Sequence, residues 1–158
     1  MALEQVGYNS PEGCIAYGVH REVLSGGSTR TLLPDQSGAL VLLDTASGSV
    51  ITLPTPVVGM QFEFNTTVSV TSNSHKVITA ASDEFLVGGV ISANLTVAAS
   101  GDFFVADGTT HVAITSNGST TGGLVGGGFR LTAISTTQWS IEGLICGSGT
   151  NADPFATS

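Results

Sequence analysis

The sequence predicts an all-β protein, and three observations lead to that prediction. The chain has 21 glycines, 18 serines and 20 threonines among 158 residues, a composition that suits strands and turns. It has only four lysines and arginines in total, although helix surfaces are usually rich in such long side chains. Turn signals recur about every 8–12 residues, which is the spacing of a β-sandwich or barrel.

Short runs with alternating apolar and polar residues lie between these turns. Residues 61–65, 111–115, 129–133 and 138–141 alternate in this way, which predicts half-buried antiparallel strands. Residues 39–43 are apolar throughout, so we expect a strand covered on both faces. We expect about ten strands and at most one helical turn. The residues expected in one buried layer are Phe62, Phe64, Val112, Ile114, Leu131, Trp139 and Ile141.

The chain divides into three segments by composition. Residues 1–28 are predicted to be an N-terminal arm and linker, because they end in the flexible sequence Ser25-Gly26-Gly27-Ser28. Residues 29–146 are predicted to form the sandwich domain. Residues 147–158 have the composition of a C-terminal tail.

The charge balance excludes two classes of partner. With four cationic side chains, 12 acidic ones and a formal net charge of −8, the chain cannot neutralise many phosphates, so we predict no nucleic-acid binding. The same argument predicts no binding to an anionic membrane surface. The first ten residues show no export signal. We therefore expect Cys14 and Cys146 to be buried free thiols rather than a disulfide.

The residues that carry chemistry in other proteins form no convincing motif here. His20, His75 and His111 lack metal-ligand spacing, and we expect them to be solvated or locally hydrogen-bonded. Asp83 with Glu84 and Asp102 with Asp107 are interpreted as turn residues, with a structural Ca²⁺ as the alternative. No nucleophile elbow is present. We predict no catalytic, cofactor-binding or metal-binding residues, no cofactor and no enzymatic activity.

Two further features have an alternative functional reading. The glycine-rich run 122–128 lacks the pattern of a phosphate-binding loop, so we expect a mobile loop or a close-packed backbone crossing. Trp139 could form a sugar-stacking platform, but it shares a strand face with Ile141 and is predicted to lie in the core.

The arm and the tail hold the candidate interface residues. Apolar and aromatic side chains in the arm are suited to adding a strand to another chain's sheet or to filling an interface core. The alternative is that the arm pairs with the edge strand of its own domain. The candidate contacts with a capsid or a sister subunit are Tyr8, Cys14, Ile15, Tyr17, Val19 and Phe155.

Two parts of the sequence show a resemblance to a known class of proteins. The first runs from Thr31-Leu32-Leu33-Pro34 through Ser49-Val50-Ile51-Thr52-Leu53-Pro54 to Gly59-Met60-Gln61-Phe62-Glu63-Phe64. The second is Gly128-Phe129-Arg130-Leu131 with Gln138-Trp139-Ser140-Ile141-Glu142-Gly143. Together they resemble the opening module and last hairpin of small virion proteins of tailed bacteriophages. The leader 7–13 is similar to theirs, whereas the charged entry of their hairpin is replaced here by glycines.

This resemblance implies a fold, a role and partners. The fold would be an antiparallel β-sandwich of jelly-roll type with an N-terminal arm and a C-terminal tail. The role would be that of a capsid decoration (cement) protein, a homotrimer that binds the major capsid protein on the outside of the head after synthesis in the host cytoplasm. The alternative is a receptor- or glycan-binding module of a head or tail fibre, and a polysaccharide depolymerase is a more distant third.

Overall fold

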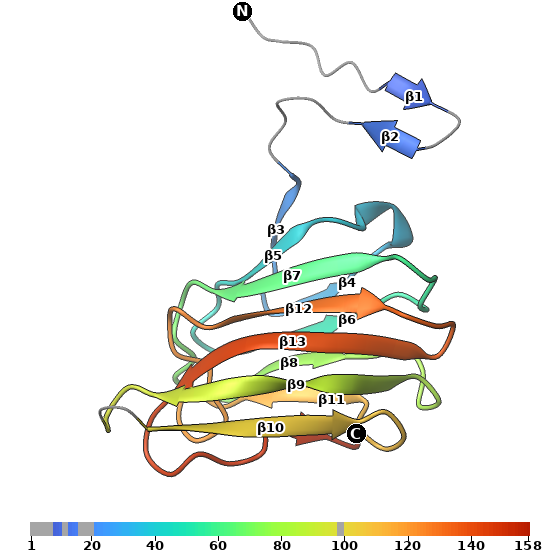
Figure 1. The fold of residues 1–158 in the computed structure, drawn as a ribbon. Helices are drawn as coiled ribbons and strands as arrows, with labels where there is room; N and C mark the ends of the chain where they lie inside the picture. Colours follow the sequence, from blue (N-terminus) through green and yellow to red (C-terminus); the bar gives the residue numbers. More distant parts are fainter. Residues whose placement is uncertain (1–7, 11–12, 16–20, 98–99) are drawn as a thin grey trace, which may run out of the picture.

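The computed structural model describes residues 8–10, 13–15, 21–97 and 100–158. Two sheets lie face to face, as Figure 1 shows. The larger contains β3 (Val23–Ser25), β5 (Leu40–Leu43), β7 (Gln61–Thr66), β9 (Phe85–Asn94), β10 (Gly101–Asp107), β12 (Gly128–Ala133) and β13 (Gln138–Gly147). The smaller contains β4 (Thr29–Thr31), β6 (Ser49–Thr52), β8 (His75–Ile78), β11 (Ala113–Ser116) and β14 (Phe155–Ala156).

The strand order shows how the chain is wound. The larger sheet has the order β10-β9-β13-β12-β7-β5-β3, and the smaller has the order β14-β11-β8-β6-β4. From β3 to β8, consecutive strands alternate between the two sheets. Each strand therefore runs beside and parallel to the strand two places earlier in the sequence, as in β3–β5, β5–β7, β4–β6 and β6–β8. After β8 the larger sheet grows by the antiparallel hairpins β9–β10 and β12–β13.

The all-β prediction with two sheets is confirmed, but the prediction of antiparallel strands is wrong for part of the fold. Alternation along one strand shows that one face is buried and does not show in which direction a neighbouring strand runs. A jelly roll is built from antiparallel Greek keys, and the winding from β3 to β8 differs from that pattern. The expected helical turn is present as the 3-10 turn η1 (Pro34–Gln36). No helix in the described part of the chain is long and apolar enough to cross a membrane.

The core lies between the two sheets, as the alternating runs predict. All seven residues expected in the buried layer are buried, and Trp139 is 0% exposed beside Phe62 at a ring-centroid distance of 6.0 Å. The core assignment of Trp139 is therefore confirmed, and its ring is not available to stack on a sugar. The strand covered on both faces is not observed, because Leu40 and Leu42 are only half-buried on the outer face of the larger sheet.

The two-sheet unit extends beyond the limits expected from composition. β3 pairs in parallel with β5 and buries Leu24, so the end of the expected arm lies in the larger sheet. β14 pairs with β11 and buries Phe155, so the expected tail completes the smaller sheet. Both short strands depend on partners that are distant in sequence, which composition does not reveal. β1 (Tyr8–Ser10) and β2 (Gly13–Ile15) pair only with each other among the described strands.

The glycine-rich run 122–128 is a close-packed backbone crossing, one of the two structures expected for it. A Cβ atom at Gly123 would lie 2.8 Å from the backbone nitrogen of Gly118, and one at Gly127 would lie 3.0 Å from that of Cys146. The backbone NH of Leu124 donates to the carbonyl of Cys146 at 3.0 Å. The run therefore packs directly against the end of β13, where side chains would not fit.

Candidate interaction surface

The outer face of the larger sheet carries a row of opposite charges. Glu63 on β7, Arg130 on β12 and Glu142 on β13 stand directly opposite one another in the strand register. The Arg130 Nε donates to Glu142 Oε1 at 3.0 Å, and its Nη2 contacts the same oxygen. The Arg21 Nη1 donates to Glu63 Oε2 at 2.7 Å, and this hydrogen bond lowers the pKa of Glu63. These exposed pairs add little stability, but they hold their side chains along the sheet.

An open groove adjoins this row. It has a volume of about 600 Å³, and three glycines, Gly126, Gly128 and Gly143, are among its lining residues. Asn65, Arg130, Glu142 and Leu144 form its sides, so polar and charged groups surround most of it. Such a depression can receive a protruding side chain or a small polar ligand.

A patch of exposed apolar side chains lies beside the charged row, toward β10. It consists of Phe103 (66% exposed) and Val105 (56%) on β10, Ile91 (52%) on β9 and Leu144 (43%) on β13. Phe103, Ile91 and Leu144 stand in one line across the three strands. Gly89 makes room for the Phe103 ring, because a Cβ atom there would lie 2.7 Å from Phe103 Cζ. We call these four residues the apolar patch. Contiguous exposed apolar surface of this kind is typical of interaction sites.

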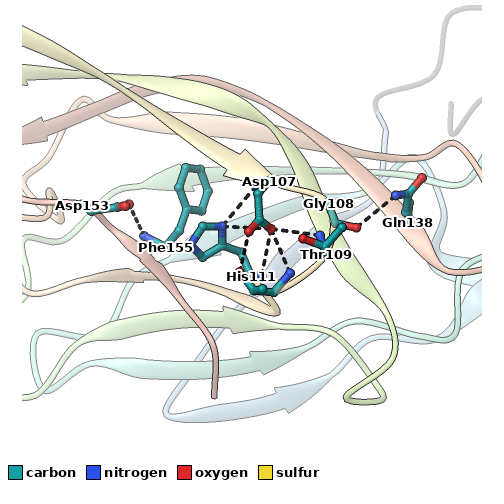
Figure 2. A network of polar contacts seen from close by, with 8 residues as sticks. Asp107, Gly108, Thr109, His111, Gln138, Asp153 and Phe155 are labelled. Carbon is teal, nitrogen blue, oxygen red and sulfur yellow. Dashed lines mark hydrogen bonds and ion pairs between the residues drawn. The ribbon is translucent and has the colours of Figure 1, made fainter.

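The end of β10 next to the patch is held by a hydrogen-bonded turn, shown in Figure 2. The Asp107 carboxylate accepts hydrogen bonds from the backbone NH groups of Thr109 and Thr110 and from the Thr110 hydroxyl, at 2.6–2.9 Å. These bonds, led by that from the Thr110 hydroxyl, hold the pKa of Asp107 far below its ordinary value. The Asp107 backbone NH also donates to His111 Nδ1 at 3.2 Å. The turn is an anchor for β10.

The structure separates the interface residues expected from sequence. In the β1–β2 pair, Tyr8 lies opposite Ile15 and Asn9 opposite Cys14, whereas Tyr17 and Val19 lie outside the described residues. Phe155 is 8% exposed, and its ring lies 5.7 Å from that of His111. Its side chain belongs to the hydrophobic core and is covered in this structure.

The histidines differ in their surroundings. His75 is 1% exposed and lies at the start of β8, close to Ser49 Oγ (3.2 Å) and to the Val68 carbonyl (3.3 Å). It is therefore hydrogen-bonded, as expected, and buried rather than solvated. Burial lowers the pKa of its imidazole. His111 belongs to the turn beside β10, and His20 lies outside the described residues.

Three of the four acidic residues considered for Ca²⁺, Glu84, Asp102 and Asp107, have other partners. Glu84 is buried and accepts hydrogen bonds from the backbone NH groups of Ala80 and Ala81. Asp102 accepts one from the Asn151 amide at 2.8 Å. In the part of the chain that the structure describes, no three acidic, histidine or cysteine side chains converge as a metal site would require. The Cys146 thiol is free and buried, and burial raises its pKa; the side chain of Cys14 lies outside the description.

Sequence reasoning missed the four residues of the apolar patch. A signal was present, because the run Phe103-Phe104-Val105-Ala106 is apolar at consecutive positions and so places apolar side chains on both faces of one strand. Leu144-Ile145-Cys146 does the same. Such runs mark either a strand covered on both sides or one with an exposed apolar face. Only the strand order shows that β10 is an edge strand.

Comparison of the chain with known protein families, with curated proteins and with solved structures finds no match.

Proposed function

We propose that the protein is a structural component of a tailed-bacteriophage virion, a decoration protein that binds the outer surface of the head and reinforces contacts between major capsid subunits. The proposal starts from the sequence resemblance of residues 31–64 and 128–143 to small virion proteins. It assigns no catalytic step and no cofactor to the chain. The proposed site of action is the exterior of the capsid, reached from the host cytoplasm during assembly.

One structural observation supports the proposal most. The two resembling segments are separated by more than sixty residues, yet β5 pairs with β7, β7 with β12 and β12 with β13. The strands β5, β7, β12 and β13 from the two segments thus form one continuous block in the larger sheet, whereas Ser49–Thr52 of the first segment form β6 in the smaller sheet. Segments of a common module are expected to be neighbours in space, so the pairing of β7 with β12 supports the proposal.

The surface of the molecule suits a static binding role. The outer face of the larger sheet combines ion pairs, a groove and the apolar patch, a mixture that resembles the composition of interface cores and rims. The short serine and threonine side chains lose little rotamer entropy when they are packed against a neighbour, and glycine has no side chain to lose any. This role requires neither the jelly-roll winding nor the trimer that the resemblance implies.

The alternative, a receptor- or glycan-binding module of a fibre, has one observation in its favour. The open groove is lined by Asn65, Glu63, Arg130 and Glu142, and such polar groups can hydrogen-bond sugar hydroxyls. A glycan array probed with the whole chain tests this alternative.

Copy number in the virion separates the two functions. Quantitative mass spectrometry of purified particles that carry this protein should find hundreds of copies, and cryo-electron microscopy should place them on the outside of the head. A few copies or tens of copies, located at a fibre, would contradict the decoration role and favour the alternative.

A further inference from the structure

The edge strand β10 has hydrogen-bonding groups without a partner strand. Two hydrogen bonds at the ends of β10 show which of its residues bond to β9. The Gly108 NH donates to the Leu86 carbonyl at 2.9 Å, and the Asn94 NH donates to the Ser100 carbonyl at 3.0 Å. Along an antiparallel pair of strands, opposite residues alternate between pairs that are hydrogen-bonded to each other and pairs that are not. Even-numbered residues of β10 therefore bond to β9, and odd-numbered residues direct their NH and carbonyl groups away from the sheet.

The outward-facing residues include both β10 members of the apolar patch. Phe103 and Val105 thus present an open backbone edge and an exposed apolar side chain at the same positions. Proteins usually protect such an edge with lysine, proline, a bulge or a short strand. β10 has seven residues, no lysine and no proline, it is in continuous register with β9, and its two charged residues, Asp102 and Asp107, lie near its ends. The outward NH of Asp107 already donates to His111 Nδ1. The edge is therefore open to pairing with another strand at Phe103 and Val105.

We propose that two copies of the chain associate through β10, which pairs antiparallel with β10 of the second copy about a two-fold axis at Phe104. In this register Phe103 of one copy lies opposite Val105 of the other. Both residues have outward-facing backbone groups, so they form hydrogen-bonded pairs. The larger sheet then continues across the axis, and the two apolar patches become one.

The edge of β10 is self-complementary in this register, because Phe103 and Val105 of each copy face Val105 and Phe103 of the other. Each chain carries a net charge of −8, so the register must also keep the carboxylates of the two copies apart. In the proposed pair Asp102 lies opposite Ala106 and Asp107 opposite Gly101, and no two carboxylates face each other. Moving the axis to Val105 would place Asp107 opposite Phe103 and expose part of the patch again. Isologous contacts of this kind close with two copies.

The pairing of β10 with a second copy does not depend on the virion role. β10 and β3 are the opposite edges of the larger sheet, six strand spacings or about 29 Å apart. An attachment at the β3 edge would leave β10 free, and a trimer formed elsewhere would be linked to further trimers by this contact.

A proline substitution in the full-length chain tests the contact. Val105→Pro removes an NH that faces away from β9, so the internal ladder is kept while two hydrogen bonds of the symmetric pair are lost. The matched control is Val23→Pro on β3. Val23 is also exposed, at 55%, and its NH faces away from β5, because the neighbouring bonds run from Leu40 to Glu22 and from Gly26 to Leu42.

The readout is molar mass by light scattering and sedimentation over a range of concentrations. We expect the unmodified chain and Val23→Pro to have the mass of two chains or an even multiple of two. We expect Val105→Pro to raise the dissociation constant of the pair about tenfold or more. An unmodified chain with the mass of one or three copies at about 100 μM, or a folded Val105→Pro variant with unchanged affinity, would overturn the proposal.

Amide hydrogen exchange tests the same contact without a substitution. The NH groups of Phe103 and Val105 should exchange more slowly at high protein concentration, and that of Val23 should not change. Exchange at Phe103 and Val105 that is fast at every concentration would contradict the pairing, whatever the behaviour of the variants.

Discussion

At the scale of single residues, His75 is the clearest departure from a solvated side chain. Its imidazole is enclosed between β6 and the segment at Val68, and the carbonyl of Val68 can only accept a hydrogen bond. His75 Nε2 therefore carries the proton, and Nδ1 accepts from the Ser49 hydroxyl. Burial is the main cause of its lowered pKa, opposed by the Val68 hydrogen bond and the charge of Asp44. The neutral ring is the form that the fold accommodates.

A pH dependence of stability follows from this residue. The pKa of His75 is lowered in the folded state, so the unfolded chain binds more protons once the pH falls below about 6.5. Stability contributed by the neutral ring is complete above that pH and is lost as the pH falls, by at most about 1.4 kcal/mol per pH unit. Urea unfolding at pH 7, 6 and 5 should show this loss.

The comparison of variants assigns the loss to His75. His75→Gln should unfold with a smaller difference between pH 7 and pH 5 than the unmodified chain. Lys76→Gln, the next residue on β8, should keep the full difference, because it changes a charge without removing the buried ring. Equal pH dependence in all three chains would show that His75 does not titrate on unfolding in this range.

At the scale of elements, β9 has a position that restricts its residues, because strands lie on both sides of it. It lies between β10 and β13 and pairs with both over most of its length. Gly88 stands opposite Ile141 with φ at 114°, and a Cβ atom there would lie 2.4 Å from the Ile141 carbonyl oxygen. Glycine is required at this point both for the backbone conformation and for the close approach of β13.

Substitution of Gly88 should therefore lower the free energy of unfolding by more than the strain of its positive φ alone would cause. Gly88→Ala should lower the free energy of unfolding by at least about 3 kcal/mol, since strain and a backbone clash add together. Gly59→Ala is the matched control, because Gly59 has φ at 94° with nothing near its missing Cβ atom, and it should cost about 1–3 kcal/mol. If the two variants unfold alike, β13 can move away from β9 at little cost.

At the scale of the whole molecule, the short strand β3 forms the edge of the larger sheet next to β5. This strand has three residues, but it covers one side of β5 and buries Leu24 at 7% exposure. Residues before it contribute no pairing to the two large sheets in the described part of the chain. The folded unit therefore includes residues 21–28, where Arg21 is bonded to Glu63 and β3 pairs with β5.

Two shortened chains test this assignment. Removal of residues 1–20 should leave the melting temperature within about 2 °C of the full chain. Removal of residues 1–27 should lower it by about 5–10 °C, because it exposes the side of β5 and deletes a buried leucine worth about 1.5–3 kcal/mol together with a strand ladder. Circular dichroism during heating gives both values. An equal loss in the two chains would show that residues 1–20 pack against the sandwich.

The sequence by itself determined the strand-rich class, the turns, the single helical turn and the buried set around Trp139. These properties are local, because alternation at period two and turn residues act within about ten positions. The candidate site was not predictable in the same way. Phe103 and Leu144 are more than forty residues apart and become neighbours only because β9 lies between β10 and β13.

The tertiary structure alone decided the direction of the strands, the ends of the folded unit and the open edge. A strand such as β3 buries the same face whether its neighbour runs parallel or antiparallel, so its residue pattern carries no information on direction. Leu24 and Phe155 belong to the core because β5 and β11 pair with their strands. Whether the apolar run of β10 is covered or exposed depends on its place in the strand order, and that order is a property of the whole chain.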